Sequence, residues 1–418
     1  MERLVVVGAS LAGLRAVESA RRTGFTGRIT LVGAEEHLPY DRPPLSKAFL
    51  DAGHEGVVTP FRDADELTGE LGVELRLGTP AEALDLAERE VVVGGRPVPY
   101  DALVIATGAG PRPFPPGEGI AGVHALRTVS DAVAIRAALD AGARTVVIGA
   151  GFIGSEVASA ARKRGLAVTV VEALDLPLTR SIGPVAGTVC AGLHRAGGTD
   201  LRLGTGVAGI EAENGRVTGV RLDGGTVLPA DLVVTGIGAL PATGWLDGSG
   251  LRLHERDGGV VCDATLWTGA PGVYAAGDVA HAVNPLFDGD LMRLEHWTNA
   301  AEQGAAAARH ALDPASARPL DSVPYFWSDW YGHRLQFVGT PVADEVCTAE
   351  PERKGFAALY RRGDRIVGAL TVDRPRDIMK YRRRIVERDE WTGTPTGKKH
   401  ESSSDQPVHH DRPGPGQR

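Results

Sequence analysis

Hydrophobic and polar positions follow the same order in two separate parts of the chain. In each part, a run rich in β-branched residues precedes a glycine turn, an Ala-rich stretch and a second apolar run. This order predicts a strand, a turn, a helix and a second strand, which together form a βαβ unit. The predicted strand, helix and second strand are 4–7, 14–23 and 29–32 in the first copy, and 144–148, 155–164 and 167–171 in the second.

Apolar runs between polar, Pro-rich stretches predict further elements. Residues 300–312 are Ala-rich and predict a helix, and the Pro-rich stretch 111–116 predicts a hinge or a crossing between domains. Short strands and aromatic residues over 323–391 predict a third domain, whereas 392–418 has hardly an apolar residue and predicts a disordered tail. Additional strands are predicted at 91–93, 103–106, 217–222, 232–235 and 273–276.

These elements predict an α/β protein with two Rossmann-like dinucleotide-binding domains and a C-terminal α+β domain. The length of 418 residues agrees with two to three domains. The net charge of −8 argues against a general nucleic-acid binder. No apolar run approaches the roughly 18 residues that span a bilayer, and the run at 4–7 is too short for a signal peptide. We therefore expect a cytoplasmic protein with neither a membrane nor a nucleic acid as partner.

The three cysteines exclude several redox and metal centres. Cys190, Cys262 and Cys347 are far apart, and none belongs to a CxxC pair, so neither a zinc ribbon nor a dithiol redox motif is expected. A cluster held by four Cys thiolates would need one more cysteine. We expect three inert thiols in a reducing compartment and no metal site.

The turns of the two copies have the spacing of a dinucleotide fingerprint. In such a turn the first glycine permits the tight bend, the second lets the backbone approach a pyrophosphate, and the third lets helix and strand pack closely. The helix N-terminus then presents free N–H groups to the phosphates. The first copy has a serine at the second position, which is small enough to preserve this approach. The positions are Gly8, Ser10 and Gly13 in the first copy and Gly149, Gly151 and Gly154 in the second.

An acidic residue follows the second strand of each copy. Glu35 and Glu172 occupy these places, where a carboxylate can hold ribose hydroxyls. Glu172 would accept a hydrogen bond from a 2′-OH and repel a 2′-phosphate, and the nearest basic residue downstream is Arg180. Two sites imply two cofactors, with the second copy binding the nicotinamide nucleotide and preferring NADH to NADPH.

Five further segments resemble one family. They are 38–47 (LPYDRPPLSK), 100–108 (YDALVIATG), 271–278 (PGVYAAGD), 295–304 (EHWTNAAEQG) and 324–329 (PYFWSD). In this order they are similar to the putidaredoxin reductase-like, FAD- and NADH-dependent ferredoxin reductases of bacterial oxygenase systems. The resemblance covers residue 3 to about 390 and leaves only the tail outside. It implies a glutathione reductase-type arrangement, with 1–111 and 238–320 forming the FAD domain, 112–237 the NAD domain and 321–391 the reductase domain.

The resemblance also implies roles for individual residues. Arg42 would contact the adenosine half of FAD, Asp278 the ribitol, and Trp297 would lie near the isoalloxazine ring. Ala81 would meet the adenine through its backbone, and Trp327 contacts either the flavin edge or the core. The implied FAD site comprises Gly8, Ser10, Leu11, Ala12, Gly13, Glu35, Arg42, Lys47, Ala81, Thr107, Gly108, Arg127, Gly277, Asp278 and Trp297. The implied NAD site comprises Gly149, Gly151, Phe152, Ile153, Gly154, Glu172, Gly236 and Gly238.

The chemistry implied by the resemblance needs no nucleophile. NADH delivers two electrons as hydride, a [2Fe–2S] ferredoxin accepts one at a time, and a flavin can do both. Lys47 and Glu156 are the implied catalytic pair, with the lysine ammonium beside the flavin and the carboxylate keeping it protonated. The implied partner is a [2Fe–2S] ferredoxin that serves a haem monooxygenase or a Rieske oxygenase. Its docking surface is expected at 382–384 with Lys380, or at Arg361 and Arg362.

Other proteins of the same fold remain to be considered. Glutathione and thioredoxin reductases need a redox-active Cys pair, and related NADH oxidases and peroxidases need a cysteine where 39–50 has none. Monodehydroascorbate reductase shares the one-electron chemistry and stays open. An apoptosis-inducing-factor-like flavoprotein that acts as an NADH-dependent binding module also stays open. A flavoprotein with an unknown acceptor is a third alternative.

Overall fold

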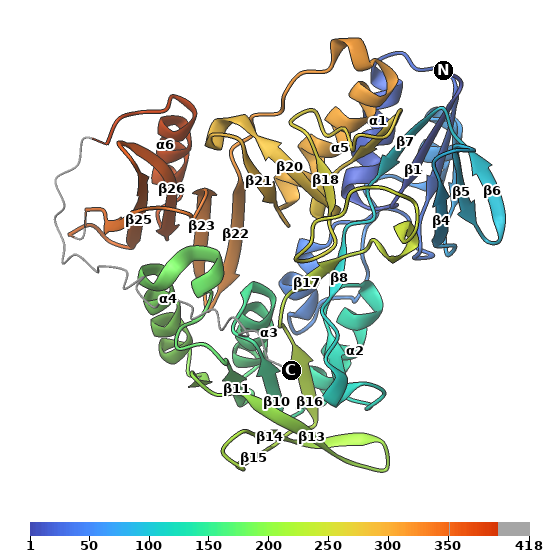
Figure 1. Cartoon of the computed structure of the whole chain (residues 1–418). Helices are drawn as coiled ribbons and strands as arrows, with labels where there is room; N and C mark the ends of the chain where they lie inside the picture. Colours follow the sequence, from blue (N-terminus) through green and yellow to red (C-terminus); the bar gives the residue numbers. More distant parts are fainter. Residues whose placement is uncertain (351, 392–418) are drawn as a thin grey trace, which may run out of the picture.

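The computed structural model describes residues 1–350 and 352–391, which are built on three five-stranded sheets (Figure 1). The tail predicted to be disordered, 392–418, lies outside the described residues. Within the described part, no helix combines the length and the apolar character needed to cross a membrane.

The first sheet is parallel and contains strands from both ends of the chain. Its order is β19 (Val273–Ala275), β7 (Ala102–Ile105), β1 (Arg3–Val7), β2 (Arg28–Val32) and β3 (Val73–Arg76). Helices α1 (Leu11–Arg22) and α5 (Trp297–Leu312) pack against each other, and a Cβ on Gly304 would lie 2.1 Å from the Ala12 carbonyl oxygen. Two small sheets flank this core: β4 (Ala81–Asp85), β5 (Glu90–Val93) and β6 (Arg96–Pro99), and β18 (Val260–Cys262), β20 (Ala280–Asn284) and β21 (Asp290–Arg293).

The second sheet repeats the parallel βαβ arrangement. Its order is β12 (Asp200–Arg202), β11 (Val168–Val171), β10 (Thr145–Ile148), β16 (Leu232–Thr235) and β9 (Val123–Ala125). The helices of this part are α2 (Val129–Asp140), α3 (Phe152–Lys163) and α4 (Thr179–Ala196). A small antiparallel sheet of β13 (Val207–Glu213), β14 (Arg216–Leu222) and β15 (Val227–Pro229) covers one side.

A two-stranded ribbon joins the first two parts. β8 (Ala109–Pro111) leaves the first part and pairs with β17 (Ala239–Pro241), which returns to it (Figure 1). The predicted hinge at 111–116 begins at the end of β8. Because both strands cross here, the sequence between them forms one unit inserted into the first.

The third sheet is antiparallel and lies at the C-terminal end. Its order is β22 (Tyr325–Trp330), β23 (His333–Gly339), β26 (Arg365–Val372), β25 (Phe356–Arg362) and β24 (Glu345–Thr348), with α6 (Pro375–Val386) packed on it. The three sheets confirm the predicted α/β class with a C-terminal α+β part. The short helices are η1 (Pro43–Ser46), η2 (Ala48–Leu50), η3 (Glu66–Glu70), η4 (Pro115–Gly117), η5 (Gly244–Leu246), η6 (Gly277–Val279), η7 (Pro285–Phe287) and η8 (Pro314–Ser316).

Two helices begin earlier than the pattern predicts. α1 starts at Leu11 and α3 at Phe152, ahead of the expected starts at 14 and 155. Ser10 and Gly151 are extended N-caps, so the residues between the second and third fingerprint positions are already helical. The expected starts were placed directly after the third fingerprint glycine, whereas each helix already includes that glycine and the two residues before it.

Candidate functional site

The two predicted glycine turns share one backbone geometry. Gly8 and Gly149 have φ of +123° and +100°, a left-handed conformation that glycine adopts without strain. A Cβ would lie 2.0 Å from the carbonyl oxygen of Ala106 at Gly8, and 2.4 Å from that of Gly236 at Gly149. Each turn therefore passes against the end of a neighbouring strand, β7 or β16, at a distance that only glycine allows.

The helices that follow the turns present their N-termini without side-chain caps. A Cβ on Gly13 or Gly154 would lie 1.9 Å or 2.3 Å from the carbonyl oxygen of the first glycine, so each helix starts directly against its strand. The N-caps Ser10 and Gly151 accept no hydrogen bond through a side chain from the first turn. The first N–H groups of α1 and α3 are thus available to an anion such as a phosphate.

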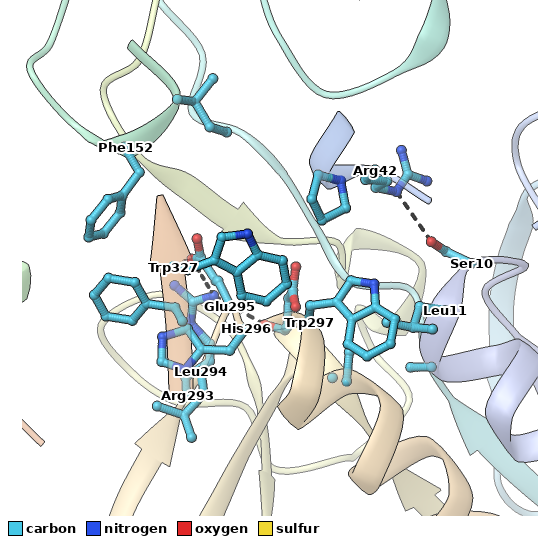
Figure 2. A pocket seen from close by; sticks show the side chains of 18 of the residues that line it. Ser10, Leu11, Arg42, Phe152, Arg293, Leu294, Glu295, His296, Trp297 and Trp327 are labelled. Atoms are coloured by element: carbon cyan, nitrogen blue, oxygen red, sulfur yellow. Dashed lines mark hydrogen bonds and ion pairs between the residues drawn. The ribbon is translucent and has the colours of Figure 1, made fainter. Parts of the chain in front are cut away.

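One cavity of about 860 Å³ connects the three parts of the molecule. Figure 2 shows it with Ser10 and Arg42 toward one side, Phe152 toward the other, and Trp297 and Trp327 between them. Its volume falls within the range of small-molecule and cofactor sites. The predicted site residues that line it are Ser10, Leu11, Ala12, Arg42, Lys47, Thr107, Gly108, Arg127, Phe152, Ile153, Glu156, Gly277, Asp278 and Trp297.

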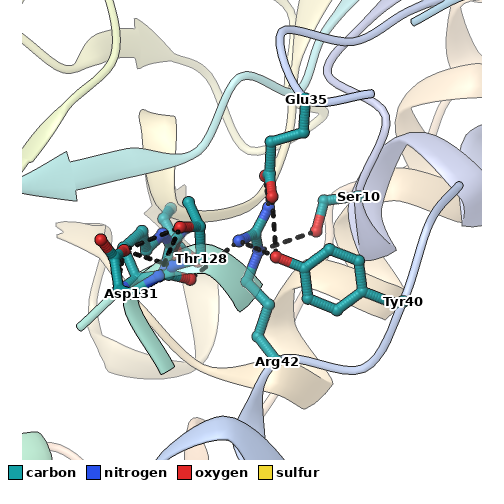
Figure 3. Close-up of polar contacts among 8 residues, drawn as sticks. Ser10, Glu35, Tyr40, Arg42, Thr128 and Asp131 are labelled. Carbon is teal, nitrogen blue, oxygen red and sulfur yellow. Dashed lines mark hydrogen bonds and ion pairs between the residues drawn. The ribbon is translucent and has the colours of Figure 1, made fainter. Parts of the chain in front are cut away.

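Arg42 organises the polar end of this cavity (Figure 3). Its guanidinium pairs with Glu35 at 2.5 Å and donates to the Tyr40 hydroxyl at 3.0 Å. It also donates to the Ser10 hydroxyl at 3.2 Å and to the Arg127 carbonyl at 2.9 Å. The serine that departs from the fingerprint is therefore a hydrogen-bond partner of this arginine, and the site tolerates it for that reason.

The electrostatics of this group keep the acid ionised and the phenol neutral. Burial opposes the ionisation of Glu35, but the charge and hydrogen bonds of Arg42 outweigh it, so the pKa of Glu35 lies below its ordinary value. Burial also raises the pKa of Tyr40 to about 12. Tyr40 donates to Glu35 at 2.7 Å, so the phenol, the carboxylate and the Arg42 guanidinium form one hydrogen-bonded group at this end of the cavity.

Asp278 lies next to Arg127 in the lining of the same cavity. The guanidinium nitrogen Nη2 of Arg127 lies 3.3 Å from the Asp278 carboxylate, and Gly277 has φ of +78°. The backbone N–H of Gly277 donates to Gln303 at 2.9 Å, which holds this turn against α5. The indole N–H of Trp297 donates to the carboxylate of Asp41 at 2.8 Å, and this hydrogen bond fixes the ring.

Lys47 and Glu156 meet at the centre of the cavity, as the resemblance implies. The ammonium of Lys47 lies 2.8 Å from Oε1 of Glu156, whose side chain is 4% exposed. The same carboxylate accepts hydrogen bonds from the hydroxyls of Ser46 and Ser328. Ser328 in turn accepts the indole N–H of Trp330 at 2.5 Å. The carboxylate, which the second part carries, is therefore held by residues of the first and third parts of the chain.

The glycine turn of the second copy lies beside the Lys47–Glu156 pair. Gly236 and Gly238 follow β16, and Gly238 has φ of +105°. The carboxylate of Glu172 accepts the backbone N–H groups of Ala150 and Leu174, both at 2.9 Å. These bonds place the acid at the mouth of the second glycine turn, where the sequence predicts a ribose.

Ten predicted site residues lie outside the cavity lining, and sequence reasoning missed other residues near it. Ala81 begins β4. The other nine are Gly8, Gly13, Glu35, Gly149, Gly151, Gly154, Glu172, Gly236 and Gly238. His296 was missed although it lies in the matched segment 295–304 and lines the cavity. It is half-buried, and desolvation lowers its pKa to about 4, so its ring stays neutral. Ser46 and Ser328 also lie in matched segments, but nothing in a serine's surroundings along the chain signals a buried carboxylate.

The three thiols stand apart from this chemistry. Cys190 and Cys262 are buried, and burial raises the pKa of each to about 12, so neither forms a thiolate at neutral pH. Cys347 is half-buried on β24. None of the three lines the cavity.

One group in the described part of the chain has metal-ligand distances. His254, Asp257 and His281 each offer an atom within 4.8 Å of the others. Arg293 already donates to Asp257 at 2.8 Å, and this cation opposes a second one. We therefore infer a hydrogen-bonded cluster that positions Arg293, which also donates to the Asp278 carbonyl at 3.1 Å.

The two expected docking clusters differ in exposure. Arg361 pairs with Glu345 at 3.0 Å, and Arg362 pairs with Asp290 at 2.8 Å, and their side chains are 28% and 22% exposed. On α6, Lys380 pairs with Asp377 at 3.6 Å and Arg383 with Glu387 at 2.8 Å, but their side chains are 73% and 76% exposed. The α6 cluster is therefore the one whose cations are more accessible to a partner.

Comparison with known proteins gives the same picture over nearly the whole chain. Residues 2–304 match the pyridine nucleotide-disulphide oxidoreductase family, and residues 325–395 match the reductase C-terminal family. Rhodocoxin reductase of Rhodococcus erythropolis is 39% identical over 91% of this chain and 88% of its own length. Putidaredoxin reductase CamA of Pseudomonas putida is 35% identical over 93% and 92%.

A solved structure agrees with these relatives. The covalent putidaredoxin reductase–putidaredoxin complex contains a chain that superposes with a TM-score of 0.85 at 35% identity, covering 93% of each chain. The similarity therefore includes the C-terminal sheet as well as both glycine turns.

Proposed function

Because the chain belongs to the pyridine nucleotide-disulphide oxidoreductase family and ends in that family's reductase C-terminal domain, we propose that it is an FAD-dependent NADH:ferredoxin reductase. It takes hydride from NADH and passes single electrons to a [2Fe–2S] ferredoxin that feeds an oxygenase. The observation that carries this function is the cavity that the first residues of α1 and α3, the helices after the two glycine turns, line together with the Lys47–Glu156 pair.

The cavity fits FAD by its shape and its chemistry. The uncapped N-terminus of α1, the cation of Arg42 and Glu35 suit a pyrophosphate and a ribose at one end. Asp278, Lys47 and the indole of Trp297 suit the ribitol and the flavin ring at the other. When bound there, FAD accepts two electrons as hydride and releases them one at a time, a conversion that amino-acid side chains do not provide.

The protein contributes orientation, charge and exclusion of water. Arg127 holds the Asp278 carboxylate in place, and Lys47 supplies a positive charge that Glu156 keeps at a defined position. Phe152, at the start of α3, contacts Phe326 with ring centroids 4.7 Å apart, which closes the nicotinamide side of the cavity against solvent.

Glu172 is expected to set the coenzyme preference. Replacing it with glutamine removes the negative charge that repels a 2′-phosphate and leaves one oxygen to accept from either the Ala150 or the Leu174 N–H. The ratio of kcat/KM for NADH to that for NADPH should fall by about tenfold. Steady-state kinetics with both coenzymes checks this, with Glu213→Gln, an exposed acid on β13, as control. An unchanged ratio in Glu172→Gln would contradict the assignment.

A ferredoxin-dependent assay tests the function as a whole. Protein purified with its native cofactor should be yellow, and NADH-driven reduction of cytochrome c should rise strongly when a [2Fe–2S] ferredoxin is added. A monodehydroascorbate reductase would instead respond to its own radical substrate, and an apoptosis-inducing-factor-like binding module would turn over slowly with every acceptor. Absence of flavin, or a rate indifferent to ferredoxin, overturns the proposal.

The exposed basic residues of α6 are expected to speed the encounter with an acidic ferredoxin. Lys380→Glu and Arg383→Glu should raise the apparent KM for ferredoxin by about 3- to 10-fold through lost electrostatic attraction. NADH–ferricyanide activity should stay unchanged, because ferricyanide needs no docking surface. Arg216→Glu, an exposed arginine on β14 of the second part, is the matched control. Loss of both activities would indicate misfolding, and an unchanged KM would place docking elsewhere.

We also propose that the enzyme works in the cytoplasm. Its free cysteines, two of them buried with thiols held protonated, suit a reducing compartment where NADH is available.

A further inference from the structure

Ser328, on strand β22 of the C-terminal sheet, lies against the buried carboxylate of Glu156. It is fully buried, and its hydroxyl donates to Oε1, the same oxygen that Lys47 contacts at 2.8 Å. Ser46 donates to the other oxygen, Oε2. A buried carboxylate needs its acceptor sites filled, and Ser328 fills one of them from outside the two nucleotide-binding parts.

The neighbouring tryptophan sets the direction of this hydrogen bond. The indole of Trp330 can only donate, and its Nε1 lies 2.5 Å from the Ser328 oxygen. The serine oxygen is therefore used as an acceptor by Trp330, and its single proton is left for Glu156. A serine held in this way cannot turn its proton elsewhere without breaking a buried hydrogen bond.

The end of β22 is also tied to α3, the helix that carries Glu156. The backbone N–H of Tyr331 donates to the Ser159 hydroxyl at 2.7 Å, and the Tyr331 hydroxyl lies 2.9 Å from Nδ1 of His194. His194 reaches back to α3 through Ser155 at 3.0 Å. Tyr331 has φ of +50°, a conformation that a bulky residue adopts only when its contacts hold it there.

Together these contacts fix β22 and α3 in one register. Trp330 packs within this junction, with its ring centroid 6.4 Å from that of Phe152 and 5.6 Å from that of His194. A shift of β22 along α3 would break the bonds of Tyr331 and move Ser328 away from Glu156. The position of the carboxylate, and through it that of Lys47, therefore depends on the C-terminal sheet.

We propose that Ser328 is a positioning residue for the first half of the reaction: it orients Glu156 so that the Lys47 ammonium stays beside the flavin. The proposal rests on the function proposed above. It gives the C-terminal domain a role in reduction by NADH, in addition to any contact with the electron acceptor.

The test compares Ser328→Ala with a matched control in the same sheet. Thr371 on β26 is also fully buried, and its hydroxyl has no hydrogen-bond partner among the described residues, so Thr371→Val removes a hydroxyl without touching Glu156. Ser328→Ala should slow flavin reduction by NADH about tenfold, consistent with loss of one hydrogen bond to a charged group. It should also make the flavin midpoint potential more negative. Thr371→Val should change neither quantity.

A double-mutant cycle distinguishes positioning from a general loss of structure. If Ser328 acts through Glu156 on Lys47, then Ser328→Ala should have no further effect on rate or potential in a Lys47→Ala background. Additive effects, or an unchanged potential in Ser328→Ala, overturn the inference.

Two further measurements keep the test decisive. If Ser328→Ala does not retain FAD, Trp330→Phe keeps an aromatic ring but removes the indole N–H together with the five-membered ring, and it should shift the potential in the same direction. An unshifted potential in that variant counts against the inference. If Lys47→Ala itself leaves the reduction rate and the potential unchanged, the proposed role of the Lys47–Glu156 pair fails. If Lys47→Ala changes both quantities but Ser328→Ala and Trp330→Phe do not, the role of the pair stands and the role of Ser328 is overturned.

Discussion

Lys47→Ala is expected to slow the reduction of bound FAD by NADH about 100-fold, the usual cost of removing one preorganised charge from a reacting centre. The ammonium lines the cavity and lies 2.8 Å from Glu156. Without it, the negative charge that arrives with the hydride has no nearby cation, and a carboxylate that is 4% exposed is left without its ion partner. Stopped-flow measurement of the loss of flavin absorbance gives the rate directly.

Two variants show whether this slowing belongs to the site. Lys163→Ala removes an exposed lysine of α3 that pairs with Asp51 at 2.7 Å, and it should leave the rate unchanged. The double variant Lys47→Ala with Glu156→Gln removes the stranded charge, so it should retain FAD better than Lys47→Ala alone while staying slow. A Lys47→Ala protein that binds FAD and is reduced at the normal rate would contradict the assignment.

Gly151→Ala should weaken NADH binding about 10- to 100-fold while FAD stays bound, because a small displacement in a nucleotide site has effects of this size. A Cβ at this position would meet only the Gly236 carbonyl oxygen, at 3.4 Å, and the residue has φ of −76°. The folded protein therefore accepts the methyl group. A pyrophosphate placed against the N-terminus of α3 does not, since the methyl group occupies its line of approach.

NADH titration of the half-reaction measures this effect. Gly149→Ala is a different change: its Cβ would lie 2.4 Å from a carbonyl oxygen at φ of +100°, so it should destabilise the whole second part. Gly192→Ala, in α4 with nothing within 4 Å of its Cβ, should leave NADH binding intact. Normal NADH affinity in Gly151→Ala would move the pyrophosphate away from this turn.

Much of the fold could be predicted because its signals are local. The glycine turn, the apolar strand before it and the helix after it lie within about 20 residues of each other, and the structure confirms both βαβ units. Helix starts were wrong by part of a turn, since the helices begin at Leu11 and Phe152, ahead of the third fingerprint glycine after which they were predicted to start. The site residues themselves stay predictions, now joined by the cavity that most of them line.

The expected docking residues show a limit of prediction from the sequence alone. In the sequence, Arg361, Arg362 and the basic run on α6 are equivalent clusters of charge. In the structure the first two form ion pairs with Glu345 and Asp290, the latter 72 residues away. Lys380 and Arg383 pair only with Asp377 and Glu387, their neighbours along α6, and stay largely exposed. Charge counts along the chain do not reveal which cations are already paired, because pairing depends on contacts between distant segments.

By itself, the sequence determined the two glycine turns, the acids that follow them and the α/β class, because each of these depends on residues that are neighbours along the chain. Only the tertiary structure decided how the proposed catalytic pair, Lys47 and Glu156, is held. Glu156 receives Ser46 from 110 positions away and Ser328 from 172 positions away. The sequence around a serine does not indicate such a partner. Only the folding of three sheets around one cavity brings these hydroxyls to the carboxylate.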